Sequence, residues 1–336
     1  MPAAAMDGRR TNRVLVIGAQ GVVGALTVRA FATAGWTVRS GARRPLPGQV
    51  EIDLDSAESI AAAVSEEELV VNTVPHPDLL VERHVLERGG TSINISALPA
   101  SAGRSLRAVA GAARGTVLMN AGLAPGVTTI VAADLLRQNP GAGELEIVFT
   151  LSVTAPRGPA SADFIIRGLT TLARHRTALV PLPQPFGERW CLGFREGDAG
   201  WLGGIAEGRV VRQYICITEQ AIHERLLVLN AAAALNNLPT ELIGARSPSA
   251  DETPSDEPVA HWIAAVREGR RLHARTVECR GDFLHAARST VVFADALLRR
   301  RQPAGCFDPE EICTLSGVQA KLNAAGITIA AQRGRV

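Results

Sequence analysis

Three glycines spaced three apart, Gly18, Gly21 and Gly24, are the residues whose spacing points most directly to chemistry. Four apolar residues at 14–17 precede them as a short buried strand would, and a helical pattern begins directly after them. In a strand–turn–helix of this kind, glycines permit a tight turn and let backbone N–H groups approach a pyrophosphate at the helix N-terminus. The spacing predicts a dinucleotide-binding turn, and a tight turn without a ligand is the alternative. The expected cofactor contacts of this turn are Gly18, Gln20, Gly21, Val22, Val23 and Gly24.

The end of the second predicted strand, at 37–40, bears on the choice of cofactor. An acidic side chain there would accept hydrogen bonds from an NAD ribose, but the sequence instead has Arg43 and Arg44. Two guanidinium groups suit a 2′-phosphate, so we expect NADP (NADPH); solvated loop charges are the alternative. Asp53, at the end of a third strand predicted at 50–54, is expected near the adenine edge, although helix capping by its neighbours is equally ordinary.

Further contacts are expected where later strands end, because the carboxyl ends of parallel strands build the ligand crevice. A fourth strand at 70–74 leads into Pro75 and His76, and a fifth at 92–95 delivers Ser96. His76 is a candidate proton donor, with a loop histidine that caps the next helix as the alternative. The cofactor contacts predicted at these ends are Thr73, Val74, Pro75 and Ser96.

A Pro-Gly helix start follows the sixth strand, predicted at 116–120. The segment from Gly122 to Gly126 opens a helix at 127–137, and the free N–H donors of that helix suit an anionic group on substrate or cofactor. A crossover loop between domains is the plainer interpretation. Six strands alternating with helices predict a Rossmann-type, doubly wound parallel sheet over residues 12–138, with the strand order 3-2-1-4-5-6.

These motifs together resemble the saccharopine dehydrogenase (saccharopine reductase-like) family. The resemblance covers residues 12–138, and its most specific part is the Gly-Leu-x-Pro-Gly helix start at 122–126. It implies an α/β fold with a second α+β domain containing an open mixed sheet, and hydride transfer between an imine and a secondary amine. Some family members use a lysine and a histidine as acid and base. The only lysine here, Lys321, matches no such position.

The second half of the chain fits such a domain, which we expect at 139–302, with 303–336 packing back on the first domain. The long alternating strand at 144–154 could extend a sheet across an interface, so a homodimer is expected. A segment rich in Ser, Pro and acids, 246–258, is expected to be an exposed loop. Other predicted strands are 178–182, 189–194, 210–218, 276–280 and 327–331, and predicted helices are 162–174, 219–235, 259–268, 283–301 and 315–325.

Candidate catalytic residues outside the nucleotide fold are few. Arg157, in a Pro-Arg-Gly-Pro loop, is the first choice for clamping a substrate carboxylate in bidentate fashion. Tyr214 and His223 are weaker candidates, because the neighbours of each are typical of a packed core. The expected catalytic set is His76, Arg157 and Tyr214, and the remaining candidates are Asp163, Arg189, Trp190 and Trp201.

Composition excludes several other functions. The chain has 336 residues, a net charge of +2 and no basic block, so we expect neither nucleic acid nor membrane as a partner. Residues 1–11 are expected to be a disordered leader without a signal peptide, which favours a cytoplasmic protein. Five scattered cysteines without a Cys-x-x-Cys pair indicate reduced thiols and no metal.

The sequence therefore predicts an NADPH-dependent oxidoreductase that reduces the C=N bond of a small, carboxylated imine or iminium. An iminium is already electron-poor, which agrees with the lack of a Tyr-x-x-x-Lys pair. Reduction of a C=O bond is the close alternative. Two further functions are compatible with the same residues: an NADP-binding redox sensor without turnover, and a non-redox enzyme that retains its cofactor.

Overall fold

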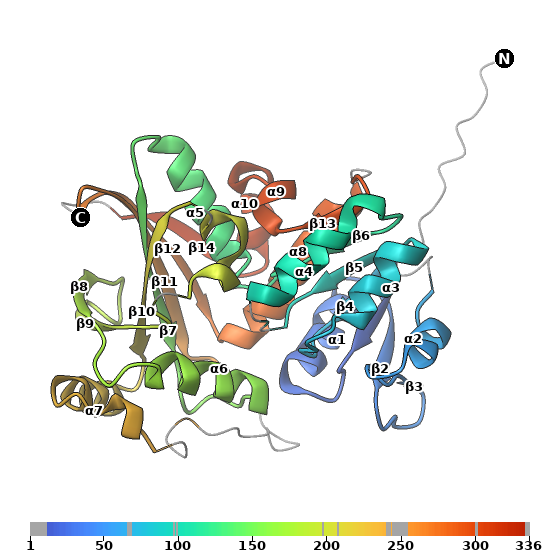
Figure 1. The fold of residues 1–336 in the computed structure, drawn as a ribbon, viewed down its shortest axis with the longest axis horizontal. Coiled ribbons are helices and arrows are strands. Elements are labelled where there is room, and N and C mark those ends of the chain that lie inside the picture. The colour runs from blue at the N-terminus through green and yellow to red at the C-terminus, as the bar shows by residue number, and fades with distance from the viewer. Residues whose placement is uncertain are drawn as a thin grey trace.

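A computed structural model describes residues 12–65, 69–96, 98, 100–196, 198–206, 208–239, 243, 255–299 and 302–332. Over these residues the chain forms two seven-stranded sheets, one on the right and one on the left of Figure 1. The predicted leader at 1–11 and most of the predicted loop at 246–258 lie outside the described residues. No helix in the described ranges has the length and apolar character needed to span a membrane.

The first sheet is parallel and has the predicted order, β3-β2-β1-β4-β5-β6, with β13 added beside β6. The order reverses between β1 and β4, where ligands bind in doubly wound sheets. The central strands β1 and β4 are short apolar runs that are almost wholly buried, as parallel strands covered by helices must be. Their bounds are β1 Arg13–Ile17, β2 Thr37–Ala42, β3 Val50–Glu51, β4 Leu69–Asn72, β5 Thr91–Asn94, β6 Thr116–Leu118 and β13 Gly305–Phe307.

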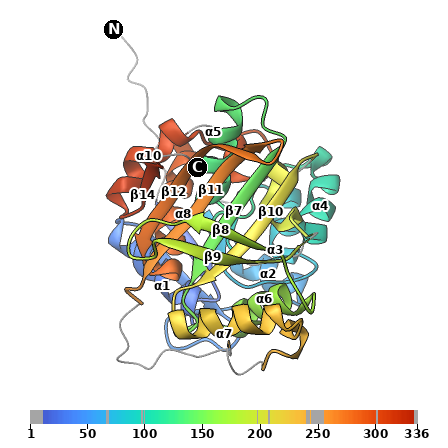
Figure 2. The same cartoon turned by 90° about the vertical axis from the view of Figure 1, so that its left-hand side faces the viewer.

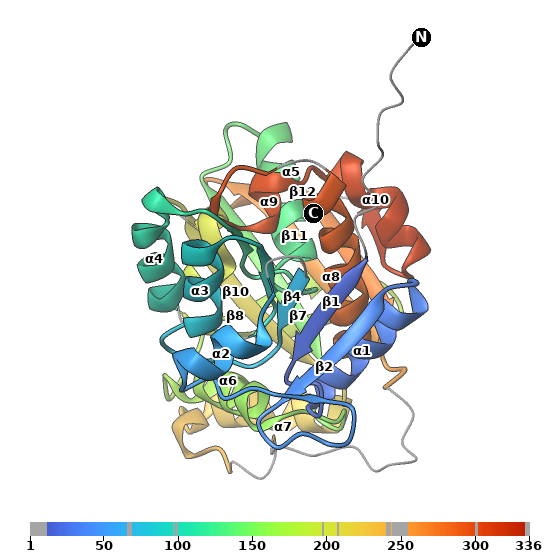
Figure 3. The same ribbon diagram turned by 90° about the vertical axis from the view of Figure 1, so that its right-hand side faces the viewer.

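Helices cover both faces of this sheet, as Figure 3 shows, and the doubly wound fold class is thereby confirmed. The helix after the fifth strand begins at Ala100. The third strand is shorter than predicted, since it ends at Glu51. The helices are α1 Val22–Thr33, α2 Ala57–Ala63, α3 Leu80–Arg88, α4 Ala100–Val109, η1 Ala110–Ala112 and α5 Val127–Gln138.

The second sheet is mixed, with the order β14-β12-β11-β7-β10-β9-β8. Only β7 and β10 run parallel; the other neighbours are antiparallel. β7 is central, so the prediction that this strand extends a sheet across an interface is wrong; the edges are β14 and β8. The strands are β7 Glu144–Leu151, β8 Thr177–Pro181, β9 Glu188–Gly193, β10 Val210–Ile217, β11 Pro258–Arg267, β12 Arg270–Arg280 and β14 Thr328–Ala331.

The helix predicted at 259–268 is wrong, because this segment is β11. Polar and apolar side chains do not alternate along β11, because this strand lies between β7 and β12 and is buried on both faces. The overlooked signal is Glu268-Gly269, a two-residue hairpin loop in which both residues have positive φ, 51° and 74°. β12, correspondingly, is longer than the strand predicted at 276–280.

The remaining helices belong to the second half of the chain. The C-terminal segment divides between the two sheets: β13 joins the first, whereas the strand predicted at 327–331 pairs with β12 in the second. Thus only part of this segment packs on the first domain. These elements are α6 Pro159–Thr170, η2 Gly200–Ala206, α7 Gln220–Ala231, η3 Leu235–Asn237, α8 Asp282–Arg299, α9 Pro309–Ile312 and α10 Leu315–Ala324.

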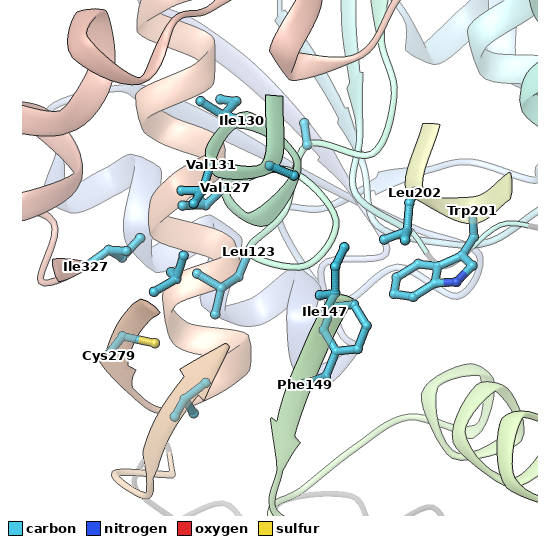
Figure 4. Packing of buried hydrophobic residues seen from close by; sticks show 14 of the residues in the cluster. Leu123, Val127, Ile130, Val131, Ile147, Phe149, Trp201, Leu202, Cys279 and Ile327 are labelled. Carbon is cyan, nitrogen blue, oxygen red and sulfur yellow. The ribbon is translucent and has the colours of Figure 1, made fainter. Parts of the chain in front are cut away.

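Residues of the second sheet alternate between two faces. The inner face, with Ile147 and Phe149 of β7, shares one continuous hydrophobic cluster with α5, α8 and the first sheet. Figure 4 shows Leu123, Ile147, Phe149 and Trp201 in this cluster, and the ring centroids of Phe149 and Trp201 lie 5.3 Å apart. The outer face carries a separate cluster that includes Val148, and Figure 2 shows β8 and β9 crossing in front of it. Only the inner face therefore meets the nucleotide-binding half.

Candidate cofactor and substrate site

In the glycine turn, residues 18–24, Gly18 and Gly24 occupy positions where a larger residue would not fit. Gly18 has φ +82°, and its N–H and that of Ala19 donate to the carbonyl oxygen of Gly41 at 2.9 and 3.1 Å. A Cβ on Gly24 would lie 1.9 Å from the carbonyl oxygen of Gly18. The turn is thus fixed to the end of β2, and α1 packs directly on it.

The N-terminus of α1 is open to an anion. Its N-cap, Gly21, is extended and makes no side-chain cap, and the first turn has no acidic residue. The first helical bond is that of Ala25 N–H to Gly21, so the N–H groups of Val22, Val23 and Gly24 have no acceptor within the helix. These free N–H groups lie at the positive end of the helix dipole, beside the space that the glycines of the turn leave open. Such a site fits the pyrophosphate of a dinucleotide.

Two arginines stand at the end of β2, as the sequence predicts. Arg43 and Arg44 are both exposed. The Gln20 side chain donates 2.8 Å hydrogen bonds to the carbonyl oxygen of Arg44 and to Oε1 of Gln49, so it joins the glycine turn to this loop. Asp53 accepts from the N–H of Asp55 at 3.1 Å, which is local turn bonding. Two exposed arginines thus follow directly after the strand whose end bonds the glycine turn.

The end of β4 touches the glycine turn directly. A Cβ on Gly18 would meet the side chains of Val74 and Thr73 at 2.4 and 2.6 Å, and the Thr73 hydroxyl donates to the carbonyl of Ile17 at 2.8 Å. His76, in contrast, has its Nε2 atom 3.1 Å from a carboxylate oxygen of Asp55, before α2. The structure therefore brings Thr73 and Val74 together with the turn and pairs His76 within the first domain.

A buried carboxylate that sequence reasoning missed ties two strand ends together. Glu82 is fully buried on α3, and its Oε1 accepts from the side-chain amides of Asn72 at 3.0 Å and Asn94 at 2.7 Å. The amide oxygens of these asparagines then accept from the N–H groups of Val74 and Ser96 at 3.0 and 2.9 Å. Ser96 is thus held by this network at the carboxyl end of β5.

The start of α5 carries a carboxylate from the same chain. Gly126 has φ +123°, and a Cβ there would lie 2.1 Å from the carbonyl oxygen of Gly122, so this Gly-x-x-x-Gly bend requires glycine. The Thr129 hydroxyl, in the first turn of α5, donates to Glu310 at 2.7 Å. Burial and the neighbouring Asp308 raise the pKa of Glu310 to about 7. The N–H groups of Val127 and Thr128 already donate to the carbonyl oxygens of Gly122 and Leu123 at 3.1 Å each, so the prediction that they are free to bind an anion is wrong.

Asp308 connects the first sheet with the second domain. Its carboxylate accepts from Asn120 at 2.8 Å and from Arg107 at 2.7 Å, and from the N–H of Gly204 in η2 at 3.2 Å. Gly203 packs on the same carboxylate so closely that a Cβ would lie 2.3 Å from it. This contact fixes η2, and hence Trp201, over the carboxyl edge of the first sheet.

Arg157 is buried, with 1% of its surface exposed, rather than extended from a loop. Its Nε donates to the carbonyl oxygen of Ala155 at 3.3 Å and a terminal nitrogen donates to that of Ser152, whereas the other terminal nitrogen has no hydrogen-bond partner among the described residues. Burial lowers the pKa of Arg157, and burial raises the pKa of nearby Asp282 to about 6. The chain thus holds a buried cation with one unused donor.

Glu219 organises the loop that carries Arg157. Its carboxylate accepts from the Ser152 hydroxyl at 2.5 Å, from the N–H of Val153 at 3.0 Å, and from the N–H and hydroxyl of Thr154 at 3.1 and 2.7 Å. Burial alone would raise the pKa of Glu219, but these hydrogen bonds outweigh it and hold the pKa at about 2. An ionised Glu219 therefore fixes the backbone at 152–154.

Tyr214 does not join these groups. It lies in the outer-face cluster, while its neighbour in β10, Ile215, lies in the inner one. Its burial raises the pKa of its hydroxyl. The buried His223 approaches the carbonyl of Trp190 at 2.7 Å, and Trp190 itself is 53% exposed. The structure thus places Tyr214, His223 and Trp190 away from the glycine turn.

Two other catalytic candidates, Asp163 and Arg189, bond to neighbouring residues. His261 is a further residue of interest that was not among the predicted candidates. Asp163 pairs with Arg167 one turn further along α6 at 2.8 Å, and Arg189 donates to the carbonyl of Phe186 at 3.0 Å. His261 lies on the inner face of β11, its ring centroid 5.6 Å from that of Phe149. The role of His261 could not be predicted, because the sequence pattern favours a helix at 259–268 and only the strand places this side chain on the inner face.

Comparison with known proteins gives only distant likenesses. No protein-family model and no curated protein matches the sequence. Similar solved structures include an amine dehydrogenase from Mycobacterium smegmatis (13% identity, 90% of this chain and 96% of that chain, TM-score 0.47) and a myo-inositol dehydrogenase from Corynebacterium glutamicum (11%, 93% and 94%, TM-score 0.43). A third is the WlbA (WbpB) dehydrogenase from Thermus thermophilus in complex with NAD and UDP-GlcNAcA (13%, 93% and 93%, TM-score 0.41).

These TM-scores lie below 0.5, so the fold assignment rests on the strand order and not on the likenesses. None of the three carries the name saccharopine dehydrogenase, and that resemblance stays a prediction.

Proposed function

We propose that this chain is an NADPH-dependent oxidoreductase that reduces the C=N bond of a small, carboxylated imine or iminium, with C=O reduction as the close alternative. The observation that carries the proposal is the acid-free N-terminus of α1 on a turn that only glycine can form, with Arg43 and Arg44 exposed beside it. This combination suits a dinucleotide that bears a 2′-phosphate.

The chain's own part in the reaction is to hold and orient. The amides of Val22, Val23 and Gly24 would hold the pyrophosphate, and Arg43 and Arg44 the 2′-phosphate. When bound, the cofactor supplies the hydride. The two strand ends fixed by Glu82 are expected to position the nicotinamide half, because they lie beside the point where the strand order reverses.

On the substrate side, Arg157 is the residue suited to a carboxylate. Its unused terminal nitrogen, in a site shielded from water, would form a charge-assisted hydrogen bond stronger than one at the surface. Glu219 holds the loop in place, so the guanidinium does not need to reorganise when substrate arrives. A positive iminium carbon needs no strong acid to accept hydride, which is consistent with the absence of a lysine near these residues in the sequence.

The direct test is a reaction panel of carboxylated imines, neutral imines and ketones, followed by the loss of NADPH absorbance. We expect turnover to be fastest with a carboxylated imine. Arg157→Gln should raise the KM for that substrate about tenfold or more relative to a neutral analogue, and Arg157→Lys should retain part of the preference because it keeps the charge. Arg167→Gln, on the exposed side of α6, is the control. It should change neither the KM for the carboxylated imine nor the preference for that substrate over its neutral analogue.

Two outcomes would contradict this function. NADPH binding without consumption in any reaction of the panel favours a redox sensor or a non-redox enzyme that retains its cofactor. Turnover of ketones alone, independent of a carboxylate and of Arg157, favours a carbonyl reductase.

A further inference from the structure

A row of aromatic rings crosses the inner face of the second sheet and ends on a histidine. Ring centroids are 5.1 Å apart between Phe164 and Trp201, 5.3 Å between Trp201 and Phe149, and 5.6 Å between Phe149 and His261. The last three side chains are buried. Because β11 alternates, with Ile263 in the inner cluster and Trp262 in the outer one, His261 faces the nucleotide-binding half. We call Phe164, Trp201, Phe149 and His261 the aromatic row.

His261 differs from the other buried histidines in its hydrogen bonding. His175 has Nε2 2.9 Å from the carbonyl of Leu169, and His285 has Nδ1 2.9 Å from that of Gly281. His223 uses both ring nitrogens, accepting from a backbone N–H at 3.2 Å and approaching a carbonyl at 2.7 Å. Neither nitrogen of His261 has a hydrogen-bond partner among the described residues.

Such a side chain opposes folding. A buried polar atom without a partner loses its bond to water and gains none, so two of them are rarely kept without a reason. Phenylalanine or leucine would fill the site without this penalty. Burial lowers the pKa of His261 to about 4, so the ring is neutral near pH 7 and offers one N–H donor and one acceptor. A neutral ring of this kind suits an uncharged ligand group rather than a carboxylate.

We propose that His261 hydrogen-bonds an uncharged polar atom of the substrate, of the carbonyl, imine or amide type, while the apolar body of the substrate lies against Phe149 and Trp201. This assignment rests on the proposed function and adds a specificity-determining residue to it. The ring nitrogens are covered in this structure, so binding displaces a neighbouring side chain. The substrate is then an apolar, preferably aromatic or cyclic, carbonyl or imine compound. Arg157 would bind its carboxylate, and His261 would bind its uncharged polar atom.

The test compares His261→Phe with His175→Phe, using acetophenone and 1-pyrroline as neutral probes. His261→Phe should raise the urea midpoint of unfolding, because it removes two unsatisfied atoms, and should lower kcat/KM for the probes about tenfold or more, while the affinity for NADPH is unchanged. His261→Gln, which restores a donor and an acceptor, should recover part of the loss. His175→Phe removes a bonded ring, so it should lower the midpoint and leave kcat/KM unchanged.

Unchanged kcat/KM for both probes in His261→Phe would overturn the assignment. A lower midpoint in that variant would do so as well, since it would mean that the ring nitrogens already have partners. Nitrogen NMR of histidine-labelled protein separates this inference from the proposed function. If NADPH is never oxidised but acetophenone still shifts the His261 ring signals, the proposed function fails and the inference stands. If neither probe is turned over or shifts those signals, the inference fails.

Discussion

The Cβ that Gly24 lacks would lie 1.9 Å from the carbonyl oxygen of Gly18, so helix α1 and the turn before it touch backbone to backbone. Gly24→Ala must push the helix off the turn, and we expect it to weaken NADPH binding at least tenfold and to lower the free energy of unfolding by about 1–3 kcal/mol. Gly103→Ala is the matched control, because Gly103 lies in α4 with open space where its Cβ would be.

The control variant should gain about 0.5–1 kcal/mol of stability and keep its cofactor affinity, since alanine is the better helix former. Fluorescence titration and urea unfolding of both variants check this pair. Equal NADPH affinity in Gly24→Ala and in the wild type would contradict the assigned role of the turn.

The low pKa of Glu219 makes the free energy of unfolding depend on pH in the acid range. Its folded-state pKa of about 2 lies below its usual 4.5, so its contribution is complete above about pH 4.5 and is lost as the pH falls through about 2. The side chain is partly exposed, so we expect about 1–2 kcal/mol. Urea unfolding at about pH 6, above this window, and at about pH 3, inside it, should show wild type and Glu219→Gln differing more at the higher pH.

Glu188→Gln, a change at an exposed residue of β9, is the control for this experiment and should differ little from the wild type in free energy of unfolding. A constant difference between Glu219→Gln and the wild type at both pH values would argue against an ionised Glu219 holding the Arg157 loop.

Glu310 and Glu311 are neighbours with opposite expected effects. Burial and Asp308 raise the folded-state pKa of Glu310 from 4.5 to about 7, so the folded state holds a proton that the unfolded chain releases, and stability falls as the pH rises through this window. Glu310→Gln should therefore gain about 1–3 kcal/mol at pH values above about 7 and much less near about pH 4.5.

Glu311→Gln should instead lose stability, because Glu311 pairs with Arg107 at 2.6 Å and accepts from the N–H of Asp308 at 2.6 Å. Thermal unfolding of both variants across this pH range measures the two effects. Stabilisation by Glu311→Gln, or destabilisation by Glu310→Gln at high pH, would be inconsistent with the charges as assigned.

In the first domain, the central strands and the glycine turn could be predicted from local sequence patterns. The apolar runs of β1 and β4 and the glycines after β1 each specify their own conformation, so strand order and the glycine turn could be predicted together. β11 could not be predicted in this way. A strand buried on both faces has no alternation, and only its pairing with β7 and β12 decides between strand and helix.

Side-chain roles in the second domain depend on which face a strand residue occupies. Tyr214 and Ile215 are adjacent in sequence yet belong to different clusters, and nothing local separates them. Arg157 could be singled out by its residue type, but the loop that carries it is held by Glu219, which is 62 residues away in sequence (219 minus 157). The carboxylate at the start of α5 arrives from Glu310, near the other end of the chain, and so it could not be foreseen.

The most direct test of the central claim is fluorescence titration of the protein with NADPH and with NADH. We expect tighter binding of NADPH, and a loss of that preference in the double variant Arg43→Ala with Arg44→Ala, on the order of 1–3 kcal/mol for each charge-assisted contact. Arg88→Ala, an exposed arginine in the last turn of α3, should leave the preference intact. Equal affinity for the two cofactors, or an unchanged NADPH affinity in the double variant, would contradict the claim.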